Sequence, residues 1–341
     1  TLFSAMAGAN PEGPAVVAGS ATIGGSGSEL TITNTPGTII NWQSFSIQPS
    51  EITRFTQNSA GSAVLNRVVG LSNSSLQGQL ISNGRVFLIN PNGVVIGNGA
   101  RIDTAGFLAS TLDISDADFL AGNYRFSGGA GSVVNNGTIT TGPGGEVVLI
   151  AANVENRGVI NAQDGEIILA AGREVTLTSL DNTNLSYRFS APADSAVNLG
   201  DLIAQNGAVG VFAGQVFNQG TISANRIGQD SAGRIVLQAD GATNVSGDIS
   251  AQGNGVPGGD ITILGNNITL SSASVDASGS NGGRVRVGGA FQGRGELPMA
   301  NRVRVDTASV IHADAQQNGN GGRIIVWSEL STRSFGRLTA R

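Results

Sequence analysis

Cysteine and lysine are both absent from this 341-residue chain, and histidine occurs only once, as His312. Without cysteine, the chain can form no disulfide, iron–sulfur cluster or cysteine-ligated zinc site, and it has no thiol nucleophile. A single histidine excludes a multi-histidine metal site, and a Ser-His-Asp triad would have to use His312. We therefore expect no catalytic residues, no metal site and no cofactor.

Charge and long apolar segments are also scarce. Charged residues make up 13% of the chain, the net charge is −5, and all nineteen cationic residues are arginines spread without a basic block. Nucleic acid is therefore not an expected partner. No apolar run approaches the length of a membrane span. Residues 1–9, TLFSAMAGA, resemble the tail of a signal peptide, the alternative being a frayed N-terminus.

Glycine is abundant instead, with 51 residues, about twice the usual share. Apolar residues still make up 40% of the chain, which is enough for a core. This composition predicts many short strands joined by tight turns.

An alternating segment with the pattern x-[VI]-x-[LVI]-x-[AG] recurs along the chain and predicts a series of strands. Its successive members are 20, 42, 26, 26, 24 and 39 residues apart. The first apolar positions, which we expect to point inward, are Val147, Ile167, Val209, Ile235, Ile261, Val285 and Ile324.

A second pattern, N-x-G-x-[IL], lies between these strands. Its asparagines are Asn135, Asn156, Asn198 and Asn218, at spacings of 21, 42 and 20, where 42 is interpreted as two units of 21. Asparagine at one repeated corner is expected to form a ladder of stacked amides.

Units this short cannot each bury a core, so they must stack. The sequence predicts an all-β fold, a single-stranded right-handed parallel β-helix with about 20–26 residues per coil. We expect a β cap over residues 10–60, where Trp42, Phe45 and Phe55 add bulk, and a continuous β-helix over residues 60–341. Residues 178–199 are interpreted as an extra coil with a hairpin or loop, and residues 290–301 as a second loop outside the stack.

The stretch INPNGVVIG, which begins at Ile89, contains a tight turn at Asn90, Pro91, Asn92 and Gly93. Pro91 has a fixed φ, and Asn92-Gly93 reaches positive φ at low cost. Two interpretations stay open, a corner only or a corner that another protein recognises. If Asn90 merely precedes the turn, Asn90→Ala should cost about 1 kcal/mol.

Carboxylates keep an enzymatic alternative open, because many polysaccharide lyases and hydrolases are β-helices. Asp113, Asp116 and Asp118 form a cluster, and Arg284 and Arg286 are expected to face outward. We interpret these residues as a solubilising face. The match GNGVPG over residues 253–258 to a dinucleotide motif precedes a strand and not a helix, so we do not expect it to bind a nucleotide.

The stretches LNRVVG and SNGRVFLINPNGVVIGNGARIDTAGFLASTLDIS, followed by ENRGVINAQDGEIILAAGREVTL and NGGRIIVW, resemble the secretion domain of two-partner-secretion exoproteins. The similarity covers nearly the whole chain, with the secretion motifs over about residues 10–180, and it is greatest to the high-molecular-weight nonpilus adhesins. The NPNL motif of the filamentous-haemagglutinin branch is absent, and Leu65 to Val68, LNRV, stand in its place.

This resemblance implies a non-enzymatic, monomeric N-terminal domain that directs secretion of a large adhesin through the periplasm and outer membrane. The implied partner is an Omp85-type TpsB transporter, whose periplasmic POTRA domains recognise Asn90, Pro91, Asn92 and Gly93. Folding of the β-helix outside the cell would follow. Parts beyond Arg341 would contact host-cell or matrix surfaces. The same module at the head of a haemolysin or contact-dependent toxin is a further alternative.

Overall fold

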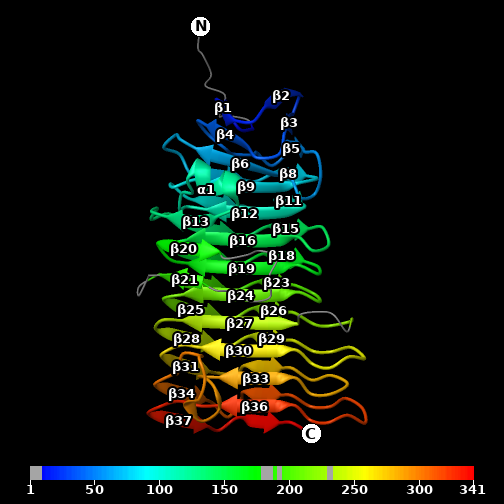
Figure 1. The fold of residues 1–341 in the computed structure, drawn as a ribbon, viewed down its shortest axis with the longest axis vertical. Helices are drawn as coiled ribbons and strands as arrows, with labels where there is room; N and C mark the ends of the chain where they lie inside the picture. Colours follow the sequence, from blue (N-terminus) through cyan, green and yellow to red (C-terminus); the bar gives the residue numbers. More distant parts are fainter. Residues whose placement is uncertain (1–9, 178–186, 190–193, 229–232) are drawn as a thin grey trace.

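Short strands stack into three long sheets that wind around a single axis (Figure 1). The computed structural model describes residues 10–177, 187–189, 194–228 and 233–341. From β6 (Ala63–Val68) onward each coil passes through the three sheets in the same order, sheet 1, sheet 2 and sheet 3, whose strands are given below; the earlier coils have no strand in sheet 2. The coils wind to the right, so the predicted right-handed parallel β-helix is confirmed.

Sheet 1 consists of β1 (Ala15–Ala18), β4 (Thr38–Trp42), β6 (Ala63–Val68), β9 (Arg85–Ile89), β12 (Gly106–Ser110), β16 (Glu146–Ala151), β19 (Glu166–Ala171), β24 (Ala208–Ala213), β27 (Arg234–Ala239), β30 (Asp260–Leu264), β33 (Arg284–Val287) and β36 (Arg323–Val326). Sheet 2 consists of β7 (Ser74–Leu76), β10 (Val94–Ile96), β14 (Ser132–Asn135), β17 (Asn153–Asn156), β22 (Ser195–Asn198), β25 (Gln215–Asn218), β28 (Ala242–Val245), β31 (Asn267–Leu270), β34 (Arg302–Val305) and β37 (Ser331–Ser334).

Sheet 3 consists of β2 (Ala21–Ser26), β3 (Glu29–Asn34), β5 (Ile52–Thr56), β8 (Gln79–Ser82), β11 (Arg101–Thr104), β15 (Thr138–Thr141), β18 (Val159–Ala162), β23 (Asp201–Ile203), β26 (Thr221–Ser223), β29 (Asp248–Ser250), β32 (Ser274–Asp276), β35 (Val310–His312) and β38 (Arg337–Thr339). A small fourth sheet and a short helix lie outside the coils; they are β13 (Tyr124–Ser127), β20 (Glu174–Leu177), β21 (Tyr187–Phe189) and α1 (Asp116–Ala121).

The predicted column of inward residues stands in register along sheet 1. Val147 pairs with Ile167, and the column continues through Val209, Ile235, Ile261, Val285 and Ile324. All of these residues are fully buried except Ile324, which is partly buried in the last strand of the sheet. The two-residue alternation within each strand therefore predicted the packing of the core correctly.

The N-terminal cap is shorter than predicted. Antiparallel pairing is confined here to β1 against β4 and β2 against β3, whereas parallel pairing already begins with β3 against β5 and β4 against β6. The parallel coils thus start near residue 29 and not near residue 60. Trp42, Phe45 and Phe55 pack against one another inside these first coils, where they fill the core. Residues 1–9 lie outside the described residues.

The spacing of 42 residues does not represent two coils. β17 pairs directly with β22, β18 with β23 and β19 with β24, so this segment advances the stack by one coil. The additional residues leave the stack as a hairpin, in which β20 pairs with β21 and with β13. Most of residues 178–193 lie outside the described residues. The interpretation of an extra coil was wrong, and that of a hairpin outside the stack was right.

Residues 290–301 leave the stack as predicted, between β33 and β34, and contain the single-turn 3₁₀ helix η1 (Phe291–Gly293). The excursion that carries α1 and β13 was not predicted as such. It lies with the hairpin on the outer face of sheet 1, where Phe119, Phe126 and Val175 bury a second apolar cluster. The outward residues Val148 of β16 and Ile168 of β19 belong to this cluster. Strands β16 and β19 are therefore apolar on both faces.

Replacing Leu169, which is fully buried in β19, by alanine should leave a cavity in the core and lower the free energy of unfolding by about 2–5 kcal/mol. Because a solenoid is stabilised mainly by neighbouring coils, we also expect faster amide exchange in β16 and β24. Urea unfolding followed by hydrogen exchange measures both effects. Val159→Ala, on the outward face of β18, is the control and should cost less than about 0.5 kcal/mol. Equal costs for the two variants would contradict the inward assignment.

Candidate functional site

The NPNG segment is a tight turn at the corner between sheet 1 and sheet 2. The N–H of Gly93 donates to the carbonyl of Asn90 at 3.0 Å, which closes a β-turn between β9 and β10. Gly93 has a φ of 119°, and a β-branched side chain there would be strained. Pro91 and Asn92 are exposed, whereas Asn90 and Gly93 are buried.

Asn90 does more than precede the turn. Its Nδ2 donates to the carbonyl of Ser72 and to Oγ of Ser74, each at 3.0 Å, and its Oδ1 accepts from the N–H of Asn92 at 3.0 Å. Ser72 and Ser74 belong to the preceding coil. Asn90 thus does not merely precede the turn, and we expect Asn90→Ala to cost more than the about 1 kcal/mol of one lost hydrogen bond.

Asn92 makes the second contact to the preceding coil. Its Nδ2 donates to the carbonyl of Gly70 at 3.0 Å from an exposed position. Asn90, Asn92 and Gly93 thus all bind the preceding coil, and the two exposed residues of the motif are Pro91 and Asn92.

The four repeated asparagines stand in one column on sheet 2. Nδ2 of each donates to Oδ1 of the next at 2.8, 2.9 and 2.8 Å, in the order Asn135, Asn156, Asn198 and Asn218. All four side chains are buried. The column is bounded by Ile96 on one side and Val245 on the other. The carboxamides act within the fold and present no free group to a ligand.

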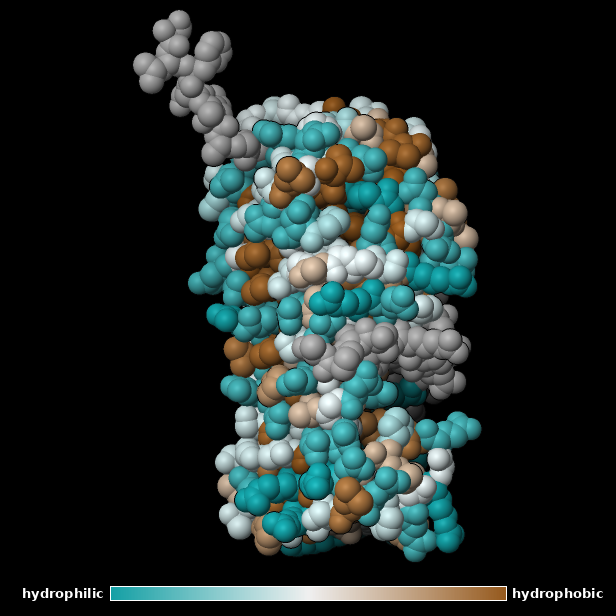
Figure 2. All heavy atoms as spheres, turned by 90° about the vertical axis from the view of Figure 1, so that its left-hand side faces the viewer, coloured by the Kyte–Doolittle hydropathy of each residue, from teal (hydrophilic) through white to brown (hydrophobic). Residues whose placement is uncertain are grey.

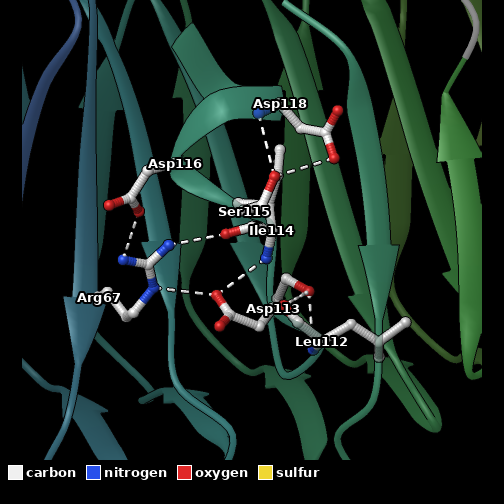
Figure 3. A network of polar contacts seen from close by, with 8 residues as sticks. Arg67, Leu112, Asp113, Ile114, Ser115, Asp116 and Asp118 are labelled. Carbon is white, nitrogen blue, oxygen red and sulfur yellow. Dashed lines mark hydrogen bonds and ion pairs between the residues drawn. The ribbon is translucent and has the colours of Figure 1, made fainter.

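The carboxylate cluster is an anchor for one arginine (Figure 3). Nε of Arg67 lies 3.0 Å from Oδ1 of Asp113, its Nη1 lies 2.8 Å from Oδ1 of Asp116, and its Nη2 donates to the carbonyl of Ile114 at 2.7 Å. Asp118 does not join this group; its N–H and carboxylate both contact Oγ of Ser115, which caps α1. The cluster fastens the α1 excursion to β6.

Electrostatics at Arg67 follow from this geometry. Burial alone would lower the pKa of the guanidinium, but the hydrogen bonds and charges of Asp113 and Asp116 outweigh it and raise the pKa above its usual value. Arg67 therefore stays charged, and two of the three aspartates are occupied in holding it. Asn66 beside it is buried and accepts a hydrogen bond from Nε1 of Trp42 at 2.9 Å. The LNRV segment is thus a structural part of the first coils.

Other candidate residues for chemistry are dispersed. Nδ1 of His312 lies 2.7 Å from Oγ1 of Thr339 and 3.6 Å from Oδ2 of Asp314, near the last coil. Arg284 forms an ion pair with Asp260 at 3.3 Å, and burial lowers the pKa of Arg286. Within the described residues, no group of three or more His, Cys, Asp or Glu side chains is placed to hold a metal ion. Residues 253–258 form a bent loop between β29 and β30, without a helix.

No helix in the described part of the chain combines the length and the apolarity that are needed to cross a membrane. The longest helix there, α1, has 6 residues.

Comparisons with known proteins agree on one family. Residues 7–251 match the family model described as the TPS secretion domain. The fold is similar to the crystal structure of the HMW1 secretion domain from Haemophilus influenzae, with a TM-score of 0.94 and 40% identity, over 97% of this chain and 91% of that one.

Curated relatives match parts of this chain and carry different names. The heme/hemopexin-binding protein of Haemophilus influenzae is 36% identical over 186 residues, which are 51% of this chain and 20% of the relative. The 16S rRNA endonuclease CdiA of Enterobacter cloacae is 24% identical over 295 residues, which are 81% of this chain and 9% of the relative. The chain thus spans a fifth or less of the length of these curated relatives.

Replacing an asparagine in the middle of the ladder should lower the free energy of unfolding more than replacing one at its end. Asn156→Ala removes the acceptor of Asn135 and the donor to Asn198, and we expect it to lower the free energy of unfolding by about 2–4 kcal/mol. Asn218→Ala removes the acceptor of Asn198, which also donates to the carbonyl of Thr221, and the weaker bond of Asn218 to the carbonyl of Gly220; it should cost about 1–2 kcal/mol. Urea unfolding of both variants measures the difference. Equal losses would show that the amides do not act as a ladder.

Replacing Arg67 by methionine should release the α1 excursion and leave the coils stacked. The side chain is largely buried and its partners are charged, so we expect a loss of about 1–3 kcal/mol. Amide exchange should become faster in residues 112–121 and stay unchanged in β24 and β27. The control is Arg157→Met, which removes an exposed ion pair with Glu155 and should cost little. Unchanged protection of α1 would contradict the role of an anchor.

Proposed function

Since the chain belongs to the TPS secretion domain family, we propose that it heads a large surface adhesin and that a cognate TpsB transporter recognises it at the NPNG corner. TPS secretion domains belong to exoproteins that are secreted across the outer membrane, and a TPS domain implies a TpsB partner in general. We propose in particular that periplasmic POTRA domains of this transporter make the contact and that they recognise Asn90, Pro91, Asn92 and Gly93. Host-cell or matrix contacts would belong to the rest of the full-length protein.

The likeness to the HMW1 secretion domain over nearly the whole of both chains supports the adhesin assignment most directly. The matches to proteins named for heme/hemopexin binding and for 16S rRNA endonuclease activity support a module that different exoproteins use. The match to the protein named for 16S rRNA endonuclease activity therefore favours the alternative, a toxin that begins with the same domain. The sequence that follows the domain in the full-length protein distinguishes the two.

We infer a non-enzymatic role from the geometry of the polar groups. Asp113 and Asp116 hold Arg67, and Asp118 contacts the cap of α1, so this cluster leaves no pair of carboxylates facing each other across a cleft. The asparagine column is satisfied internally. Turnover of a polysaccharide by the purified chain would overturn this inference.

Dependence on the transporter tests the proposed function itself. The chain, with a signal peptide, is expressed in Escherichia coli with the transporter encoded beside its gene and, in parallel, without it. We expect the chain in the culture medium only when the transporter is present, and in the periplasm otherwise. Equal release in both strains would contradict a secretion-directing role.

Recognition at the corner is tested by Asn92→Ala and Asn90→Ala together. Asn92 is exposed and makes one contact to the preceding coil, so its variant should lose less than about 1 kcal/mol and still be secreted poorly. Asn90→Ala should lose about 2–4 kcal/mol and be secreted poorly for both reasons. Secreted yield and melting temperature are measured on the same samples.

Asn254→Ala, at an exposed turn of a later coil, is the control and should change neither quantity. If the yields of the two corner variants follow their melting temperatures, the turn is only a corner. Normal secretion of Asn92→Ala would contradict the proposal that the transporter contacts the exposed residues Pro91 and Asn92.

A further inference from the structure

Charge is distributed unevenly along the stack. Nine of the nineteen arginines but only four of the 24 Asp and Glu residues lie in residues 284–341, so this segment has a net charge of +5. Residues 1–283 contain ten arginines and twenty Asp and Glu residues, which gives them a net charge of −10. The arginines form no continuous block in the sequence, but the fold places residues 284–341 in the last two coils, from β33 to β38. This end of the domain is therefore cationic, although the whole chain is anionic.

Three of these arginines lie together on the outer face of sheet 2. Arg302 and Arg304 alternate with the buried Val303 and Val305 along β34, and Arg304 stands in register with Arg333 of β37. All three arginines are exposed. Like charges on neighbouring strands repel each other. In the described part of the chain, no carboxylate forms an ion pair with any of the three.

The β-helix does not require arginine at these positions. In register with Arg304, the two preceding strands of sheet 2 carry Thr269 in β31 and Asn244 in β28. Asn267 of β31 is in register with Arg302. Sheet 2 thus stacks in the same way with uncharged residues on its outer face. The arginines add no packing to the core, and their charges are directed to the surroundings.

Two large apolar side chains border the arginines. Phe335, which follows β37, is 57% exposed, and its ring centroid lies 6.0 Å from the guanidinium carbon of Arg304. Leu330, at the corner before β37, is 67% exposed. Glu329 is the one acidic residue in residues 329–337, so the face keeps a positive net charge. Figure 2 views the side on which β31, β34 and β37 are labelled in Figure 1, and its lower end shows hydrophobic side chains among strongly hydrophilic ones.

We propose that this face, formed by Arg302, Arg304, Arg333, Leu330 and Phe335, binds a lipid surface that carries phosphate groups. Guanidinium groups form paired hydrogen bonds with phosphate oxygens. Apolar side chains beside cationic ones enter the boundary between headgroups and acyl chains. The inference goes beyond the proposed function, because it concerns the folded chain outside the cell, after it has crossed the outer membrane.

A lipid surface matches this face better than the other possible occupants do. A further strand paired with β37 would not cover it, because strands pair along their edges and outward side chains stay outward. An anionic polysaccharide would satisfy the arginines but offers no apolar region for Leu330. A second copy of the chain would have to supply carboxylates, and Asp113, Asp116 and Glu146 of the earlier coils are already paired with arginines of their own chain.

Flotation of the purified, folded chain with vesicles tests the inference. The vesicles consist of phosphatidylcholine alone or of phosphatidylcholine with lipid A, a glycolipid that carries phosphate groups. We expect binding only to vesicles with lipid A, and weaker binding as the salt concentration rises. The double variant Arg304→Gln with Arg333→Gln should bind about twentyfold more weakly, since each arginine near an anionic surface contributes about fivefold. Its melting temperature should not fall, because the two charges repel each other.

Two further variants separate the apolar contribution from the charge. Phe335→Ser should weaken binding by about tenfold and leave the salt dependence unchanged, because it removes an apolar contact and no charge. The matched control is Arg101→Gln with Arg125→Gln, which removes the same charge from exposed positions in earlier coils. This control should bind within about twofold of wild type, because those positions lie far from the face.

Equal binding of wild type and the Arg304, Arg333 double variant would overturn the inference, as would equal binding to vesicles with and without lipid A. Full displacement from the vesicles by inorganic phosphate would show that a free anion suffices, and the lipid assignment would fail. Binding of heparin through these arginines, or dimers that the double variant abolishes, would also overturn the inference if vesicles stay unbound. The double variant should be secreted like wild type, so the inference and the proposed function fail in different experiments.

Discussion

Backbone hydrogen bonding between successive coils is the constraint on which this structure depends. Neighbouring strands in a sheet lie about 4.8 Å apart, so a side chain at a given place in one coil lies directly above its counterpart in the next. This explains the column from Val147 to Val285 and the amide ladder from Asn135 to Asn218, whose members lie far apart in sequence. At Gly70, the corner of one coil lies so close to the backbone of the preceding coil that no side chain fits.

The same constraint changes the meaning of the NPNG motif. Its asparagines use their amides to hold the backbone of the preceding coil, so the motif and the loop over residues 69–73 form one element built from two coils. Exposed groups of this element come from both coils, Leu71 from one and Pro91 with Asn92 from the other. The two asparagines therefore contribute to the stacking of these coils, apart from any role in recognition.

Periodicity in the sequence was enough to predict the fold, the inward column and the position of the NPNG turn, because each follows from local alternation and turn chemistry. It could not show whether 42 residues make two coils or one coil with a hairpin, since spacing does not reveal which residues pair. Apolar residues on both faces of β16 and β19 were the available sign of a covering excursion. Arg67 and Asp113 are 46 residues apart, and the exposure of Leu71 depends on tertiary structure; neither has a local signal.

The central claim is that the transporter recognises the NPNG segment, and a competition experiment tests it most directly. A synthetic peptide of residues 85–102, which contains NPNG and its flanking strands, competes with the labelled chain for the purified transporter. The account predicts that the peptide displaces the label at about a hundredfold excess and that the same peptide with Asn90 and Asn92 replaced by alanine does not. Equal displacement by the two peptides, or none by either, would contradict the account.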